Sequence, residues 1–487
     1  MSAKKIIIWH RNDLRLHDRE PFDKAIEEKA QIIPVYCFDP RHFATTSFGF
    51  PKTGKYRAQF LLESITDLRN SLQQLGSDLI VRWGFPESEI VKIAAEIKAD
   101  AVYYQKETTA EETAVEKKLE RALSEIDVAS KSFWEATLYL LEDLPFEIAQ
   151  IPELFTNFRK QVEKKSEIKE PIPTPDKLPS LPNISLGKIP TLQDLGIAAP
   201  NYDERAVLKF VGGETTALKR LQHYFWDTDC LQNYKETRNG MLGADYSSKF
   251  SAWLAHGCIS PRYIYARVQQ YERERIKNNS TYWLVFELIW RDFFHFICEK
   301  HGNKIFRKSG LQGIDLPWKQ DWERFNLWCE GKTGYPLVDA NMREIATTGF
   351  MSNRGRQNVA SFLTKNLGID WRMGAEWFES LLVDYDVCSN WGNWNYTAGV
   401  GNDARGFRYF NIPKQSKDYD RHGDYLRHWL SELASIPGGK IHEPWKLNPE
   451  EQKRYNVQLG VDYPRPVVDF FKSVKANEKI YQNAVNR

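Results

Sequence analysis

Short apolar segments alternate with helical segments over residues 1–135, and this alternation constrains the fold more than any other feature. Five segments are short and rich in β-branched and aromatic residues, as strands are: 4–10, 31–39, 78–84, 99–105 and 128–134. Apolar residues recur with helical spacing at 56–75, 87–99 and 110–125. The alternation predicts a doubly wound parallel sheet, which binds ligands at the carboxyl ends of its strands.

The strand pattern stops before residue 200. Residues 170–191 contain six prolines and predict an extended linker on the surface. Beyond it the periodicity is helical, and the longest helical segment spans 281–302. We therefore expect an α/β plus all-α protein with an α/β domain at 1–135, a connecting linker at 136–200 and an all-helical domain at 201–487.

The composition is that of a globular protein, with 42% apolar and 27% charged residues among 487. No run of 18 apolar residues exists, so no membrane partner is expected. The apolar run at the start is too short for a secretion signal, which predicts a cytoplasmic location. The six cysteines form no CxxC pair, which argues against structural zinc and favours reduced thiols.

The aromatic residues are unevenly distributed. Of 16 tryptophans, only Trp9, Trp83 and Trp134 precede residue 200. In the later part, DYDVCSNWGNWNYTAG (384–399) combines two acids with several oxidisable rings. Asp384 and Asp386 could form a metal pair, or they could accept hydrogen bonds from a heterocycle or a ribose. The aromatic cluster beside them favours a flat organic cofactor, so no metal is expected.

Two further segments each have a functional and an ordinary interpretation. In GADYSSKFS (243–251), Ser247, Ser248 and Ser251 could hold a phosphate at a helix start, or one of them could be a simple N-cap. In FELIWRDFF (286–294), Glu287 and Trp290 could read and stack a base, or Glu287 could pair with Arg291 beside a core ring. Neither a P-loop nor a GxGxxG motif occurs in the required context.

Four long blocks resemble the photolyase/cryptochrome family, in the family's order and over almost the whole chain. They are IIIWHRNDLRLHD (6–18), ELIWRDFF (287–294), EGKTGYPLVDANMREIATTGFMSNRGRQ (330–357) and DYDVCSNWGNWNY (384–396). TRNGMLGADYSSKFSAWLAHGCISPR (237–262) and GVGNDARGFRYFN (399–411) are most similar to the DASH-type cryptochromes. The resemblance implies an N-terminal antenna domain, a helical FAD domain and DNA as the partner. We expect the protein to be a monomer.

The resemblance also implies roles for individual residues around FAD. The segments that hold the FAD phosphates and ribityl chain are matched by Tyr234, Ser247, Ser248, Phe250 and Ser251. Asp384 matches the acid that pairs with an arginine, here Arg356, against the flavin. Asp386 matches the acid at the flavin ring edge, and Asn390 the residue that faces flavin N5.

Further matches concern electron transfer, the antenna and DNA. Trp394, Trp371 and Trp318 match the tryptophan relay that reduces the flavin after light absorption. Glu107 matches the carboxylate that holds a folate antenna, 5,10-methenyltetrahydrofolate. Positions that line the lesion pocket or touch DNA are matched by Arg238, Glu287, Trp290 and Asn353.

Two residues depart from the members that repair cyclobutane dimers in duplex DNA. Gln357 replaces their methionine, and Tyr396 replaces their second tryptophan. The paired histidines of the members that repair (6–4) photoproducts are absent near Asn353 and Gln357, which argues against that activity. The resemblance implies a photolyase-type lyase that splits cyclobutane pyrimidine dimers in single-stranded or looped DNA. The alternative is a blue-light photoreceptor or DNA-binding transcriptional regulator with little repair.

Overall fold

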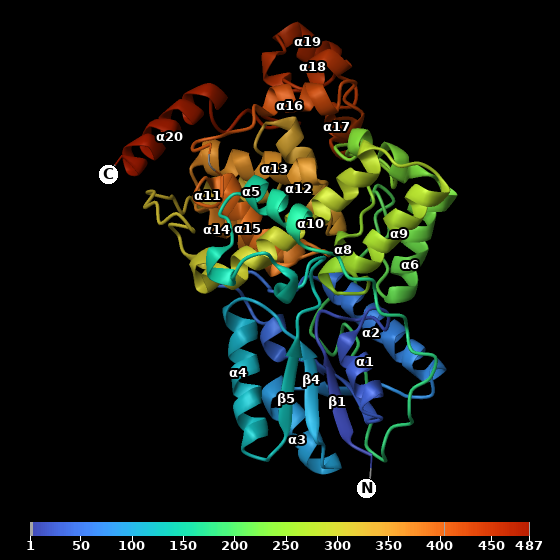
Figure 1. Ribbon diagram of the computed structural model, residues 1–487. Coiled ribbons are helices and arrows are strands. Elements are labelled where there is room, and N and C mark those ends of the chain that lie inside the picture. Colours follow the sequence, from blue (N-terminus) through green and yellow to red (C-terminus); the bar gives the residue numbers. More distant parts are fainter. Residues whose placement is uncertain (1–2, 404, 487) are drawn as a thin grey trace.

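The first apolar segment forms β1 (Lys5–His10), the central strand of a parallel sheet. We describe residues 3–403 and 405–486 from a computed structural model, in which the sheet lies below a large helical domain (Figure 1). The sheet order is β3-β2-β1-β4-β5, so the chain winds outward from β1 in both directions. The other strands are β2 (Gln31–Phe38), β3 (Ile80–Trp83), β4 (Ala101–Gln105) and β5 (Ala129–Phe133).

Both faces of this sheet are covered by helices. Ile7 pairs in register with Ile33 and Val102, and these side chains pack into one core cluster together with residues of α3 and α4. Ile6 and Ile8 point to the opposite face and belong to a cluster that continues into the helical domain. All five predicted strands are present, as are the three predicted helices of this domain, α2 (Lys55–Gln74), α3 (Pro86–Ile97) and α4 (Ala110–Ser124). The domain also contains α1 (Glu20–Glu27), which was not predicted.

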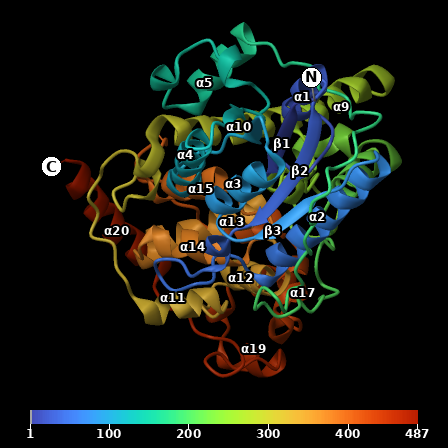
Figure 2. The same cartoon turned by 90° about the horizontal axis from the view of Figure 1, so that it is seen from below.

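The connection between the domains is partly ordered into helix. Residues 136–200 contain η2 (Leu141–Asp143), η3 (Ile148–Gln150) and α5 (Phe155–Lys165), and α5 packs on α10. The proline-rich stretch 170–191 has neither helix nor strand. It covers the edge of the sheet, because Val81 N donates to Leu186 O at 2.7 Å. Figure 2 shows α5 on the side of the molecule opposite to α19.

The helical domain is built around the long helix α10 (Asn279–His301). Asn278 starts this helix with a capping box, and Asp292 in its middle accepts hydrogen bonds from Leu138 N and Tyr139 N at 2.9 Å each. The helical elements of this domain that precede α10 are α6 (Glu214–Gln222), η4 (His223–Asp227), η5 (Cys230–Asn233), α7 (Tyr234–Thr237), α8 (Ser251–Ala255) and α9 (Pro261–Glu274).

After α10 the chain continues in helices to its end. These are η6 (Gly302–Phe306), α11 (Trp322–Cys329), α12 (Pro336–Thr348), α13 (Asn353–Ser361), η7 (Phe362–Leu367), α14 (Trp371–Leu381), α15 (Val387–Ala398), α16 (Ile412–Tyr419), α17 (Asp424–Trp429), η8 (Ser431–Leu433), α18 (Gly438–Ile441), η9 (Pro444–Lys446), α19 (Pro449–Arg454) and α20 (Phe470–Val485). Within the described parts of the chain, no helix has the length and apolarity needed to cross a membrane.

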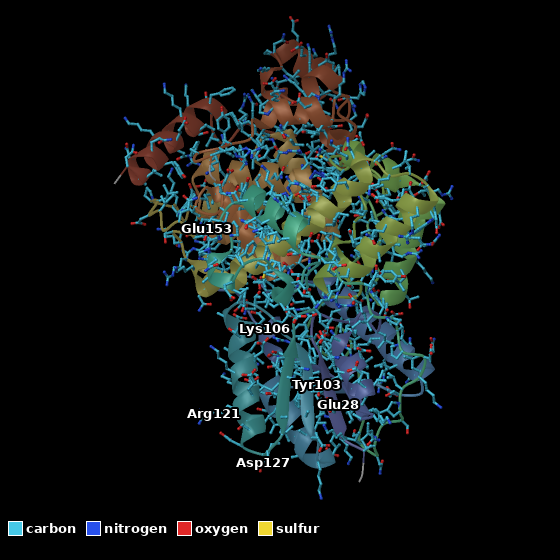
Figure 3. The ribbon with its side chains drawn as sticks, viewed as in Figure 1. Glu28, Tyr103, Lys106, Arg121, Asp127 and Glu153 are labelled. Atoms are coloured by element: carbon cyan, nitrogen blue, oxygen red, sulfur yellow. The ribbon has the colours of Figure 1, made fainter. Side chains whose placement is uncertain are left out.

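Several polar contacts join the two domains. Arg262 and Asp18 pair at 2.8 Å, and Lys106 reaches Glu299 at 3.1 Å. Lys106 lies at the level where the sheet meets the helices (Figure 3). The segment RNDLRLHD (11–18) takes part in this junction through buried ion pairs and hydrogen bonds.

Candidate cofactor and substrate cavity

One cavity of about 580 Å³ lies inside the helical domain. It gathers residues that are far apart in the chain, from the 246–251 loop, α10, α13 and α15. Among the residues predicted to bind a cofactor or DNA, those that line it are Tyr234, Arg238, Ser247, Ser248, Phe250, Ser251, Glu287, Trp290, Asn353, Arg356, Gln357, Asp384, Asp386, Asn390, Trp394 and Tyr396. Glu107, Trp371 and Trp318 lie outside it.

The first acid of the 384–399 segment is held by an arginine. Arg356 lies in the first turns of α13 and donates from one guanidinium nitrogen to both Asp384 carboxylate oxygens, at 2.8 and 3.0 Å. Asp384 is buried, whereas Arg356 is half-buried and also donates to Met351 O. The paired charges lie at the cavity wall, where they can meet polar groups of a ligand.

The second acid has a partner that the sequence did not indicate. Asp386 caps α15 by accepting from Ser389 N at 2.6 Å, and His295 Nε2 lies 3.0 Å from its other oxygen. Burial alone would raise the pKa of Asp386, but the His295 and Arg291 charges hold it well below its usual range. Burial alone would lower the pKa of His295, but Asp386 raises it to about 10. Asp386 is therefore a fixed carboxylate in a buried ion pair.

The sulfur of Cys388 lies near this pair. The candidate ligand atoms of His295, Asp386 and Cys388 are all within 4.8 Å of one another, a separation at which a metal ion could bind. Arg291, however, approaches Asp386 at 3.8 Å, and His295 carries a proton in the ion pair. Two positive charges beside the carboxylate disfavour a cation at this position.

The backbone of the serine-rich loop is held by hydrogen bonds from another residue that sequence reasoning missed. Arg220 on α6 donates to Ser248 O, Ser247 O and Ala244 O at 3.0–3.1 Å and to Asp245 Oδ1 at 2.7 Å. The loop also places two buried polar atoms, Tyr246 Oη and Lys249 Nζ, without a protein partner among the described residues. Unpaired buried polar atoms at a cavity wall favour a polar ligand there.

Asn390 has its amide orientation fixed by the backbone. Its Nδ2 donates to Ala375 O on α14 at 3.0 Å. Because an amide has its donor and acceptor at opposite ends, Oδ1 is the end left to accept a hydrogen bond at the cavity. Asn390 therefore presents a neutral acceptor to a ligand.

The three tryptophans of the predicted relay differ in burial. Trp394 lines the cavity and is 2% exposed, Trp371 is fully buried, and Trp318 is half-buried near the surface. Helices α14 and α15 pack closely here, because a Cβ atom added to Gly374 would lie only 2.3 Å from the Trp394 ring. Trp394 lies at the cavity and Trp318 near the surface, as the two ends of such a relay would, and the individual electron-transfer roles stay predictions.

The remaining wall of the cavity is aromatic and basic. Glu287 pairs with Arg238 at 2.9 Å, and not with Arg291 as the helical spacing alone allowed. Trp290 stacks on Phe155 of α5 with ring centroids 3.6 Å apart, and it meets Tyr396 edge-on at 6.0 Å. The contribution of Phe155 could not be read from the sequence, because it comes from the segment interpreted as a linker.

Glu107 lies outside the cavity, after β4 in the α/β domain. It accepts hydrogen bonds from Gln105 Nε2 at 3.0 Å and from Asn12 Nδ2 at 3.3 Å. Burial, opposed by Arg11, raises the pKa of Glu107 to about 7. A carboxyl group of this kind can offer either an acceptor or a donor to a bound heterocycle.

Comparison with known proteins identifies the family. Residues 6–176 match the DNA photolyase family, and residues 283–483 match the FAD binding domain of DNA photolyase. The chain is 63% identical to a cryptochrome DASH of Gloeobacter violaceus over 484 residues, which covers 99% of this chain and 97% of that protein. The chain belongs to the photolyase/cryptochrome family.

Solved structures of this family agree with the fold. A Synechocystis cryptochrome superposes with a TM-score of 0.96 at 58% identity, over 99% of this chain and all of that one. A class III photolyase from Agrobacterium tumefaciens gives 0.87 at 30% identity, over 100% and 99% of the two chains. The predicted fold class and the DASH-type resemblance are confirmed.

The residues of the cavity fit the FAD that this photolyase/cryptochrome domain binds. The volume of about 580 Å³ lies within the range of cofactor sites, and the wall combines aromatic rings with a few placed polar groups. Asp384 and Asp386 provide fixed acceptors, and the 246–251 loop provides hydroxyls and buried donors. The chain is therefore a flavoprotein of the photolyase/cryptochrome family.

Proposed function

We propose that this protein is a deoxyribodipyrimidine photolyase-type lyase that uses blue light to split cyclobutane pyrimidine dimers, with a preference for single-stranded DNA. FAD supplies the light-driven electron transfer when it is bound. The observation that carries the proposal is that the FAD cavity also contains Glu287, Trp290 and Tyr396 in one wall. A flavin protein that only transfers electrons would not need such a wall.

The side chains of this wall suit a base that has left its stack. Trp290 stacks on Phe155 and also contacts Phe294 at a centroid distance of 5.7 Å, and we assign the part of its ring that lines the cavity to a pyrimidine dimer. Glu287 can hydrogen-bond the edge of a base, and Arg238 beside it can contact a phosphate or keep the carboxylate in place. We assign Asn353, exposed at the start of α13, to the same contact surface.

The single-strand preference follows from the energy of base flipping. Extracting a base from a duplex costs a few kcal/mol, and stacking on an aromatic side chain returns about 1–3 kcal/mol per base. Tyr396 offers a smaller ring than tryptophan, and its hydroxyl is held by Arg405 at 2.5 Å. Gln357 presents an amide whose desolvation offsets part of any hydrogen bond that it makes to a base. A deficit of about 1.4 kcal/mol already weakens binding tenfold, and a single strand avoids most of the extraction cost.

We further propose that Trp394, Trp371 and Trp318 conduct electrons toward the flavin site, that Asn390 faces flavin N5, and that Glu107 helps to hold a folate antenna. We also propose that the protein is monomeric and cytoplasmic. The support for Trp394 is its burial at the cavity wall, and that for Asn390 is its backbone-fixed amide. The support for Glu107 is its half-buried carboxyl group beside Gln105 and Asn12.

The test is illumination of the FAD-loaded protein with one dimer-containing oligonucleotide, first single-stranded and then annealed to its complement. At equal, subsaturating protein we expect far more repair of the single strand. Equal yields would refute the preference. Absence of repair on both substrates would refute the enzyme assignment and favour the alternative, a photoreceptor or DNA-binding regulator.

A further inference from the structure

Gln357 lines the cavity on α13, and one end of its amide is occupied by a neighbour on the same helix. Arg354 donates from its guanidinium to Gln357 Oε1 at 3.0 Å. A guanidinium has five N–H donors and no acceptor. Because the guanidinium can only donate, the amide atom that faces Arg354 is the acceptor oxygen Oε1 and not the NH₂ group.

Arg354 is itself held by two other contacts. It donates to Asn239 Oδ1 at 2.9 Å, and its guanidinium lies over the Tyr419 ring at 4.4 Å from the centroid. These contacts come from the segment after α7 and from α16, so three different parts of the chain fix one guanidinium. Rotation of the Gln357 amide by 180° would bring its NH₂ group against these donors and lose a hydrogen bond.

The amide nitrogen of Gln357 is then the end left for a substrate. Among the described residues, Nε2 donates to no protein acceptor, and Gln357 is only half-buried at the cavity. A donor at such a position gains most when the ligand brings a carbonyl oxygen. Glu287 lines the same cavity with a carboxyl group, which can accept from a ring N–H.

We infer that Gln357, oriented by Arg354, selects pyrimidine dimers that carry a carbonyl at C4 over dimers that carry an amine there. This inference rests on the proposed function and names its substrate class. Thymine and uracil present a C4 carbonyl next to an N3–H, which complements an amide donor in a cavity that also contains a carboxylate. Cytosine presents the reverse pattern, an exocyclic amine next to a bare N3. Gln357 is a specificity residue, and Arg354 is a positioning residue.

The test measures binding in the dark by the FAD-loaded protein. Three single-stranded oligonucleotides of one sequence carry a thymine, a uracil or a cytosine dimer, and the cytosine dimer is used fresh because saturated cytosine deaminates to uracil. We expect the thymine and uracil dimers to bind alike, and the cytosine dimer about tenfold more weakly, because one hydrogen bond is replaced by two facing donors.

Substitutions at Gln357 and Arg354 separate the effect of the Gln357 amide orientation from the overall affinity for dimers. Gln357→Met removes the donor, and Arg354→Met frees the amide to rotate, so both should bring the ratio of thymine to cytosine affinity close to one. Arg354→Lys keeps a group with donors only, and it should keep most of the discrimination. The flavin absorbance spectrum of each variant reports whether the cavity still holds FAD.

The outcomes distinguish this inference from the proposed function. Equal binding of all three dimers by the unmodified protein would overturn the inference and leave the repair proposal standing. The same would follow if Arg354→Met weakened all dimers alike and kept the ratio, since Arg354 would then be a general DNA contact. Discrimination in the dark without repair in the light would uphold the inference and reject the repair proposal. No binding of any dimer would reject both.

Discussion

Replacement of His295 by glutamine should show how much the buried ion pair beside the flavin site contributes to stability. His295 is 5% exposed, and its Nε2 lies 3.0 Å from Asp386 Oδ2. The rise of its pKa from 6.5 to about 10 corresponds to an upper limit of about 5 kcal/mol, at about 1.4 kcal/mol per unit. Arg291 also faces Asp386 at 3.8 Å, so part of the attraction survives the substitution. We expect His295→Gln to lower the free energy of unfolding by about 3 kcal/mol at pH 6.5.

The loss of unfolding free energy in His295→Gln should depend on pH in the direction set by the raised pKa of His295. Because the pKa of His295 is raised in the folded state, its contribution is complete below pH 6.5 and is lost as pH rises toward 10. The difference between the unmodified protein and His295→Gln should thus shrink from about 3 kcal/mol at pH 6.5 to below about 1 kcal/mol near pH 10.

The assay is urea unfolding of flavin-free protein, followed by tryptophan fluorescence between pH 6.5 and 10, so that FAD affinity does not enter the result. His256→Gln is the matched control, because burial lowers the pKa of His256 to about 4 and this histidine is neutral throughout that range. Its cost should change by no more than about 0.5 kcal/mol over that range, from protonation of the unfolded state near pH 6.5. A His295→Gln cost that is equally flat, or one below about 0.5 kcal/mol at pH 6.5, would refute the assignment of a charged pair.

Three further predictions concern the proposed cofactor roles. Trp394→Phe should abolish or greatly slow photoreduction while FAD stays bound, and unchanged photoreduction kinetics in transient absorption would exclude Trp394 as the first donor. Asn390→Asp should lower the flavin midpoint potential by on the order of 30 mV or more, because a carboxylate opposes added negative charge on the ring; a spectroelectrochemical titration that finds no drop would contradict this. Glu107→Gln should weaken binding of 5,10-methenyltetrahydrofolate about tenfold through loss of a charge-assisted hydrogen bond, and an unchanged affinity in an absorbance titration would remove Glu107 from the antenna site.

Local patterns were sufficient to predict the five strands of the sheet and the fold class. The strand β1 is buried on both faces because it is central in a parallel sheet, and its sequence is therefore a continuous apolar run. The proline-rich stretch 170–191 was predicted to be extended for an equally local reason, since proline fixes φ and removes a donor. Helix α5 was missed inside 136–200 because its main support is packing against α10, which no local pattern reveals.

The acids and serines of the site could be named from the sequence because they lie in compact blocks, and the resemblance to the photolyase/cryptochrome family gave them roles. Apart from Arg356, which the resemblance implied as the partner of Asp384, their partners could not be named. Asp386 is held by His295, 91 residues away, and the serine loop is held by Arg220 on α6. Glu287 pairs with Arg238 and not with the residue one helical turn away. Spacing predicts only neighbours along one helix, whereas these contacts depend on how separate helices pack.

The sequence by itself thus determined which chemical groups are present and which secondary structures carry them, since propensity and periodicity act over a few residues. Only the tertiary structure decided which ends of the polar groups remain available to a ligand. The oxygen of Gln357 is used by Arg354 and the nitrogen of Asn390 by Ala375 O, so these two amides offer opposite ends to the cavity. The physical reason is that an amide has a donor end and an acceptor end, and the neighbour that claims one end is brought by the fold.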